Sequence, residues 1–321
     1  MNLFEQLKLI PKVDMHINLT SSISVNLASY LDDRKSILDI ELLMQEKNYR
    51  DYENSLKLPV EILNNNENIA LAVNNLIDNL EKNNVIYSEL FFDLPIYNKN
   101  IDEEKVLNII LQVINNRNYH MQVVLVMDSE REKEENLRTL DIFFKYYNRG
   151  VNAIYFHKNK MTNLSDYTYI FDRLIKNNCP YILNMNSKET SQDEEIYLNA
   201  KRIIYSLPIY DEILFDKLRK NNIILEFSIT RLKENKVFDD FKNYFIYDLV
   251  KENTNLTITS ADMTTMNTDI LNEWCLLFNN YSFVLHDLIR ITNNNILKAN
   301  IDNDTKEKLI DELKDKSNLV L

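Results

Sequence analysis

Short apolar segments alternate with longer amphipathic segments along almost all of the 321-residue chain. The apolar segments have the length of β-strands, and the amphipathic segments carry apolar residues at helical spacing. Strands that alternate with helices are parallel and joined by right-handed crossovers. The predicted strands are residues 12–19, 85–93, 121–128, 151–157, 180–186, 201–206, 223–230 and 255–262. Eight such units favour a closed (β/α)8 barrel over an open sheet.

Helical spacing predicts a long crossover after the first strand, at residues 24–47 and 68–81. The other predicted helices are residues 102–116, 130–147, 165–178, 193–200, 210–221 and 239–250, with two or three more closing the chain. No linker or low-complexity segment interrupts this pattern. The prediction is therefore a single α/β domain over residues 1–321, a TIM barrel with extra helices after strand 1 and at the C-terminus.

Glycine occurs once in the chain, at Gly150. A glycine-rich phosphate loop is therefore excluded. Three predicted helices end in Lys-Asn-Asn, at residues 82–84, 176–178 and 220–222. Asparagine tolerates the left-handed conformation better than other non-glycine residues, so these asparagines are predicted to end the helices where glycine would be usual.

Charge and cysteine content restrict the possible partners. The formal net charge is −12, which disfavours nucleic acid and anionic membranes as partners. The only cysteines, Cys179 and Cys275, are far apart, which excludes a disulfide framework and a cysteine-based zinc site. With no apolar run of membrane-spanning length and no signal-peptide pattern, we expect a cytoplasmic protein. Abundant Asn, Ile, Lys and Tyr suggest a bacterial genome of low GC content.

Barrels of this kind carry their sites at the carboxyl ends of the strands. The polar residues predicted there are His16, Asn18, Asp93, Asp128, His157, Asn184, Asn186, Tyr205, Ser206, Ser228, Thr230, Thr259 and Asp262. Zinc needs three or four His, Cys or carboxylate ligands, and this set contains few of them. A metal site would require the barrel to bring His16, His157 and Asp262 together.

These strand ends resemble those of the adenosine deaminase family of zinc-dependent barrel hydrolases, from Pro11 to about Leu313. The family opens with Pro-Lys-(Val/Ile)-(Asp/Glu)-Leu-His-x-His-Leu-Asp-Gly-Ser, and residues 11–22 follow this order and length. Asn18 stands where the family has its second zinc histidine. Residues 89–93 resemble the Glu-x-Arg-Phe-(Asp/Ser) strand, with Phe91 in place of the arginine.

The resemblance implies that most of the zinc and catalytic residues are replaced here. The family's fifth strand ends in His-Ala-Gly-Glu, and residues 184–187 stand at the corresponding positions here. Asn184 therefore replaces a zinc histidine, and Ser187 replaces the glutamate that shuttles protons. In the sixth, Tyr205 replaces the catalytic histidine. In the eighth, Thr-Asp-Asp-Pro becomes residues 260–263, with Ala261 at the zinc aspartate and Asp262 at the purine-contacting one. Of the four metal ligands, His16 alone is retained.

Family members perform metal-assisted hydrolysis, in which zinc activates a water molecule. The replacements lead us to expect no cofactor here and a pseudoenzyme that binds a nucleoside-like small molecule or a protein partner. Its expected ligand-binding residues are His16, Asn18, Asn184, Asn186 and Asp262. A purely structural role is the alternative for each, with the asparagines bonding one another in the space that zinc would fill.

Three other functions remain open. One is an enzyme of metal-independent acid–base chemistry that uses Tyr205, His157 or Asp262, although Tyr205 could equally fill a vacated pocket. Another is an active adenosine or purine deaminase with a rebuilt metal site. The third is a structural subunit for a homologous partner or a second copy, which predicts a large exposed apolar surface.

Overall fold

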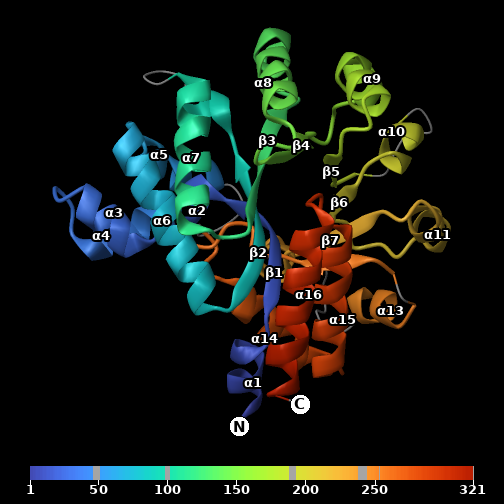
Figure 1. Ribbon diagram of the computed structural model, residues 1–321. Helices are drawn as coiled ribbons and strands as arrows, with labels where there is room; N and C mark the ends of the chain where they lie inside the picture. The colour runs from blue at the N-terminus through green and yellow to red at the C-terminus, as the bar shows by residue number, and fades with distance from the viewer. Residues whose placement is uncertain (46–50, 98–101, 188–192, 238–243, 253, 321) are drawn as a thin grey trace.

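The computed structural model describes residues 1–45, 51–97, 102–187, 193–237, 244–252 and 254–320 (Figure 1). Eight parallel strands lie in chain order in one sheet, and helices surround them. The strands are β1 (Lys12–Asn18), β2 (Val85–Phe92), β3 (Met121–Asp128), β4 (Val151–His157), β5 (Tyr181–Met185), β6 (Arg202–Tyr205), β7 (Ile224–Phe227) and β8 (Leu256–Ile258). The predicted TIM barrel is confirmed.

The barrel closes through the segment that follows the short strand β8. The amide of Ala261 donates to His16 O at 2.9 Å, and the amide of Asn18 donates to Ala261 O at 2.8 Å. This parallel bridge between Ile17 and Ala261 holds the end of β1 against the β8 side of the sheet. It also brings the first and last polar strand ends of the sequence together.

The helices run in chain order as α1 (Leu3–Leu9), α2 (Leu19–Ser22), α3 (Val25–Leu31), α4 (Ile37–Met44), α5 (Tyr52–Ile62), α6 (Asn66–Lys82), α7 (Glu103–Arg117), α8 (Lys133–Tyr146), α9 (Thr168–Lys176), α10 (Glu194–Leu198), α11 (Glu212–Lys220), α12 (Ile229–Glu234), α13 (Ile246–Lys251), α14 (Ile270–Asn280), α15 (Leu285–Lys298) and α16 (Asn303–Asn318). Short 3-10 helices occupy Leu94–Tyr97 and Leu164–Tyr167. The predicted extra helices after strand 1 and at the C-terminus are present. Both termini lie at the same end of the molecule, near α1 (Figure 1).

Some predicted segments differ from the structure, and one lies partly outside the described residues. In the predicted helix 24–47, the described residues 24–45 contain two helices, because Asp32 binds Arg34 and Lys35 in a turn and Ser36 caps the start of α4. The predicted seventh strand stops at Phe227, since the chain turns into α12, where the Glu273 carboxylate accepts from the amides of Ile229 and Thr230. Residues 239–243 of the predicted helix 239–250 lie outside the described part of the chain.

Asparagines end the predicted helices as expected. Asn84, Asn178 and Asn222 have left-handed φ values of 54°, 51° and 60°. Gly150 has a φ of 99°, and a Cβ atom there would lie 2.5 Å from Leu111 Cδ2. That one glycine therefore occupies a position which no other residue could take without displacing Leu111.

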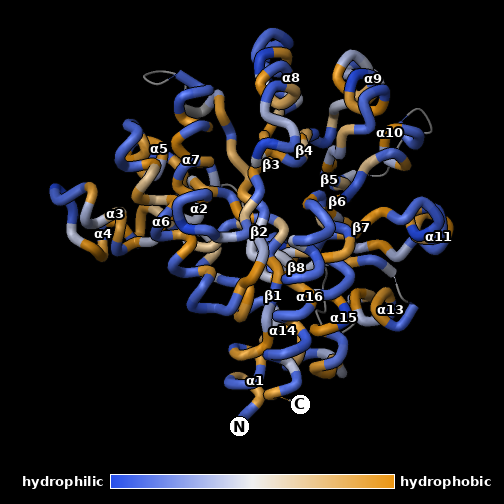
Figure 2. Tube along the Cα trace, viewed as in Figure 1, coloured by the Kyte–Doolittle hydropathy of each residue, from blue (hydrophilic) through white to orange (hydrophobic). Residues whose placement is uncertain are grey.

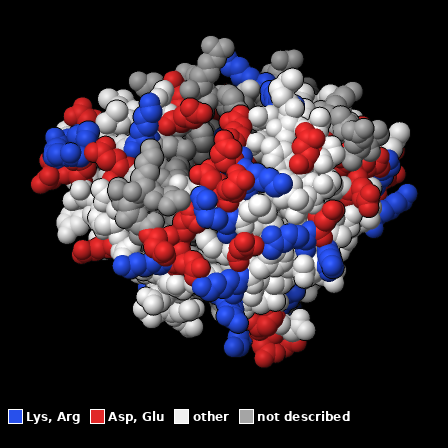
Figure 3. Space-filling model, turned by 90° about the horizontal axis from the view of Figure 1, so that it is seen from above, with Lys and Arg blue, Asp and Glu red and all other residues white. Residues whose placement is uncertain are grey.

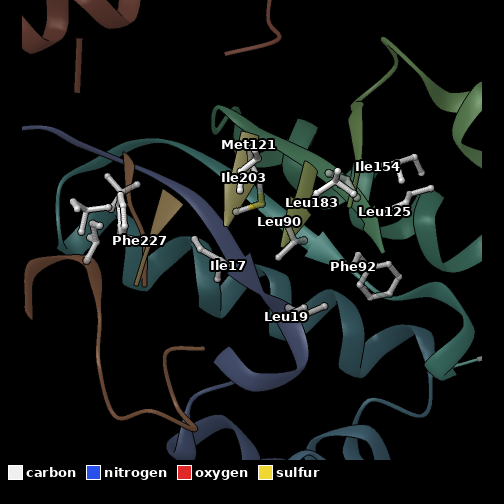
Figure 4. Close-up of a cluster of buried hydrophobic side chains, with 14 of the residues drawn as sticks. Ile17, Leu19, Leu90, Phe92, Met121, Leu125, Ile154, Leu183, Ile203 and Phe227 are labelled. Carbon is white, nitrogen blue, oxygen red and sulfur yellow. The ribbon is translucent and has the colours of Figure 1, made fainter. Parts of the chain in front are cut away.

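The two faces of each strand have different surroundings. Ile17, Leu90, Leu125 and Leu183 belong to the large apolar core that includes residues of the surrounding helices (Figure 4). Along the chain, apolar and polar positions alternate through strands and helices alike (Figure 2). A second, smaller apolar cluster contains Phe91, Val124, Tyr155 and Ile182 from neighbouring strands, inside the barrel. Of the helices described, none is both long and apolar enough to cross a membrane.

Candidate functional site

Buried charged side chains of β1, β2, β6 and β7 meet inside the barrel. The Arg202 guanidinium lies 2.8 Å from a carboxylate oxygen of Glu89 and 2.8 Å from one of Glu226. His16 Nδ1 donates to the other oxygen of Glu226 at 2.5 Å. All four side chains are buried, so each charge depends on its partners in place of water. The network fixes the position of the His16 ring.

The ring face of His16 and its second nitrogen, Nε2, have different surroundings. Its ring stacks on Phe91, with the centroids 3.7 Å apart and the planes inclined by 13°. Its Nε2 atom is buried and has no hydrogen-bond partner in the described part of the protein. A histidine whose Nδ1–H is held by a carboxylate presents Nε2 to a metal or ligand, so His16 keeps the arrangement of a ligating histidine.

Asp262 is the centre of a second cluster, at the carboxyl ends of β1 and β8. Its carboxylate accepts from Asn18 Nδ2 at 2.7 Å, from the Ser21 hydroxyl at 2.5 Å and from the Tyr52 hydroxyl at 3.0 Å. It also forms an ion pair with Arg231, whose guanidinium lies over the Tyr52 ring, 5.0 Å from its centroid. The chain's own side chains thus satisfy both oxygens of this carboxylate.

Opposing effects determine the charge of Asp262. Burial of the carboxyl raises its pKa, while Arg231 and the hydrogen bonds from Ser21 and Asn18 lower it. The lowering effects prevail, so the pKa of Asp262 lies below its usual value and the group is ionised at neutral pH. Arg231 therefore supplies the positive charge beside this buried carboxylate.

A partly exposed acid–base pair lies across the mouth, at the ends of β3 and β4. His157 Nδ1 and Asp128 Oδ2 are 2.9 Å apart, and the His157 side chain is 44% exposed. Burial raises the pKa of Asp128, but the hydrogen bonds from His157 and the Glu130 amide and the charges of His157 and Arg131 together outweigh it, so the pKa lies below its usual value. Nearby, Arg131 pairs with Asp93 at the end of β2. This half of the mouth is reachable from solvent.

The asparagines at the end of β5 bind backbone more than one another. Asn184 accepts from the Lys158 amide at 2.7 Å and donates to Lys158 O at 2.8 Å. Asn186 Nδ2 donates to the same carbonyl at 3.1 Å, while its buried Oδ1 has no hydrogen-bond partner among the described residues. Ser187 accepts from Lys158 Nζ at 3.4 Å. Asn184 thus ties β5 to the chain after β4, and Asn186 retains a free acceptor.

Tyr205 lies away from these clusters. It is buried against Phe215 and Phe245, with ring centroids 5.3 and 5.9 Å away, and its hydroxyl donates to Ile209 O at 2.6 Å. Burial also raises its pKa. Its neighbour Ile204, by contrast, packs with the cluster inside the barrel. Tyr205 therefore belongs to the outer apolar layer, and the structure does not bring it to His16 or Asp262.

Sequence reasoning overlooked Arg231, Tyr52 and the Glu226–Arg202 pair. Glu226 and Arg202 stand on the inward-facing positions of predicted strands, where a charged residue among apolar neighbours signals a buried partner. Arg231 directly follows the predicted seventh strand, residues 223–230, in α12, which the sequence did not predict. Tyr52 is the first residue of α5, a helix that the sequence did not predict, so no local signal connected it with Asp262.

The eight strands and the polar residues at their carboxyl ends place the chain among the (β/α)8 barrel proteins, which carry their sites at this end of the barrel. Comparison with known families then identifies the family within this class of barrels. The family model described as adenosine deaminase matches residues 11–316, and the chain belongs to the adenosine deaminase family. The resemblance seen at the strand ends is thereby confirmed.

Relatives cover nearly the whole chain. An adenosine deaminase of Clostridium kluyveri is 24% identical over 337 residues, covering 97% of this chain and 96% of the relative. A solved structure of arabidopsis ADAL complexed with IMP has a TM-score of 0.84 at 15% identity and covers 99% of this chain and 100% of that one. An amidohydrolase from Burkholderia ambifaria with bound Zn has a TM-score of 0.81 at 13% identity, covering 100% and 94%. At these identities the solved structures show the fold.

The expectation of no cofactor is corrected by these comparisons. Members of the family use zinc, and the B. ambifaria structure is reported with bound Zn. In this chain the residues at the family's metal positions fit zinc only in part. His16 offers a free Nε2, but Asn18 and Asn184 are amides, Ala261 has no donor, and the described residues include no group of three or more His, Cys, Asp or Glu side chains placed to hold a metal ion.

Proposed function

We propose that this chain is a pseudoenzyme of the adenosine deaminase family, which binds a purine nucleoside or nucleotide in its barrel mouth without deaminating adenosine. The observation that carries the proposal is the Asp262–Arg231 pair. A carboxylate that already accepts from Asn18, Ser21 and Tyr52 and is neutralised by Arg231 is not free to work on a substrate. In the motif comparison, Ser187 also replaces the glutamate that would move the proton.

Two buried polar atoms support ligand binding. His16 Nε2 and Asn186 Oδ1 have no hydrogen-bond partner among the described residues. Leaving such an atom unpaired costs about 1–3 kcal/mol, which a ligand with matching donors or acceptors would recover. Purines offer both hydrogen-bond donors and acceptors. Solved relatives of the same fold are complexes with IMP and with GMP.

Calorimetric titration with adenosine, inosine, AMP and IMP tests binding, and ammonia release from adenosine tests catalysis. We expect binding of at least one purine and no ammonia, both in protein as purified and after addition of zinc. Asn186→Ala should weaken binding, while Asn199→Ala, an exposed asparagine that bonds only within its own helix, should not. Ammonia release that a chelator abolishes would refute the proposal.

The His157–Asp128 pair favours a second candidate, an enzyme of acid–base chemistry. A histidine oriented by a carboxylate and 44% exposed is positioned to transfer protons. This candidate predicts turnover of a purine nucleoside or nucleotide that is lost in His157→Gln. Retention of full turnover in that variant would exclude it.

We also propose that residues 1–321 form one domain in a reducing cytoplasm of a bacterium. Cys179 and Cys275 are both free thiols, and curated relatives come from Clostridium. A single cooperative unfolding transition, unchanged by reducing agent, is the expected result. Two separate transitions would contradict the single domain.

A further inference from the structure

Helix α4 is apolar on two opposite faces. Six of its eight residues are Ile, Leu or Met. Ile40 and Met44 are fully buried against the rest of the protein. Leu38 and Leu42, one turn apart on the opposite side of the helix, are 67% and 60% exposed. Large apolar side chains gathered on an exposed helix face mark an interaction surface, so this outer face points to a partner.

Neighbouring residues extend this face. The exposed surface of α3 and α4 consists of Tyr30 (77% exposed), Ile37 (46%), Leu38 (67%), Leu42 (60%) and Leu43 (48%). The two helices pack on each other and stand at the edge of the molecule, away from the strands (Figure 1). The exposed fractions amount to about three whole side chains, or roughly 600 Å² at ~200 Å² for a large side chain. That is the upper limit of the apolar patches usual on monomers.

We infer that the α3–α4 surface is the interface between two copies of this chain. Two such surfaces facing each other would bury about 1,200 Å², which reaches the range of stable protein interfaces. The turn between the helices carries Arg34 and Lys35, and Asp39 follows on α4, so the rim has both signs of charge. A twofold interface needs this self-complementarity, because each patch meets its own copy.

A membrane is the less favourable occupant of this surface. The formal net charge is −12, so an anionic bilayer would be repelled on average. On the described face seen in Figure 3, acidic and basic side chains are mixed, with no large basic patch in view. A second copy carries the same net charge, but its own α3–α4 surface offers apolar side chains against which those of the first copy can pack.

Sedimentation equilibrium of the full chain, over nanomolar to high micromolar concentrations, tests this inference. We expect a dimer, and the double variant Leu38→Glu/Leu42→Glu should weaken association roughly 100-fold or more, because two central apolar contacts become buried charges. Ile213→Glu is the matched control, since Ile213 is 72% exposed on α11. It should leave the dimer intact. Tyr30→Glu, on the other helix, should weaken the dimer as well.

Cross-linking gives a second readout that is independent of charge. In a twofold interface a residue near the axis meets its own counterpart, so Leu38→Cys or Leu42→Cys should form an intermolecular disulfide on oxidation, and Ile213→Cys should not. A monomer at every concentration would overturn the inference, including one that binds lipid vesicles through α4. A dimer that Leu38→Glu/Leu42→Glu leaves intact would overturn it too.

Discussion

Replacing Arg231 by methionine tests the electrostatic interpretation of the Asp262 cluster. The change removes the ion-pair partner of Asp262, while methionine keeps much of the apolar volume over Tyr52. Asp262 is 1% exposed, so its carboxylate would remain buried with hydrogen bonds from Asn18, Ser21 and Tyr52 alone.

The expected loss of unfolding free energy is about 2–3 kcal/mol at pH 7. Breaking a buried ion pair by removing one partner costs about 3–5 kcal/mol. The loss should be smaller here, because Arg231 is itself 22% exposed and three hydrogen bonds to the carboxylate remain.

The pH dependence gives the sharper test. In the native protein the pKa of Asp262 is lowered, so its contribution to stability is present above the unfolded-state pKa of about 3.9 and is lost as the pH falls through the folded-state pKa. Without Arg231 the effect of burial should dominate and raise the pKa of Asp262. Protonation would then neutralise the buried carboxylate of the variant. The difference in unfolding free energy between the native protein and the variant should therefore shrink as the pH falls from 7 to 4.

Urea unfolding followed by the fluorescence of Trp274, the chain's only tryptophan, measures both quantities. Arg173→Met is the matched control. Arg173 also pairs with a carboxylate, at 2.9 Å from Asp141, and also lies 5.0 Å from an aromatic centroid, but its carboxylate is 68% exposed. Such an exposed pair contributes about 0–1 kcal/mol. Equal losses in the two variants, or a deficit at Arg231→Met that is the same at pH 4 and pH 7, would refute the reasoning.

Other predictions concern stability. Arg202→Met should cost about 3–5 kcal/mol in urea unfolding, because Glu89 and Glu226 would lose their shared buried cation, and a loss under 1 kcal/mol would show that the network is not coupled. Burial raises the pKa of Glu273 to about 7, so between about pH 4.5 and pH 7 the native state keeps a proton that the unfolded chain has lost. The free energy of unfolding should therefore fall as the pH rises through this range. Glu273→Gln should make this fall less steep, and an unchanged slope would contradict the assignment to Glu273. Ala261 has a φ of 54°, so Ala261→Gly should raise the free energy of unfolding by up to about 1 kcal/mol. Ala153→Gly, in the extended strand β4, should lower it. A change of the same sign in both variants would contradict the strain argument.

The sequence alone determined the architecture. Alternating strand and helix patterns, together with Lys-Asn-Asn helix ends, are local signals, because each depends on residues a few positions apart. Strands β3 and β4 occupy the predicted residues, and Asn84, Asn178 and Asn222 take the predicted left-handed conformation. The strand-end motifs likewise sufficed to indicate the family, since their order along the chain follows the order of the strands.

Tertiary structure decided the state of the site. Asp262 meets Tyr52 across 210 residues and Arg231 across 31, and no periodicity relates these positions. Tyr205 is the last residue of β6, near the predicted strand end, but the alternation along β6 turns its ring to the outer layer against Phe215. Charge pairing and burial depend on distances in space, which closure of the barrel alone establishes. The physical reason is that a strand end fixes where a side chain begins, whereas its neighbours decide where it points and what charge it bears.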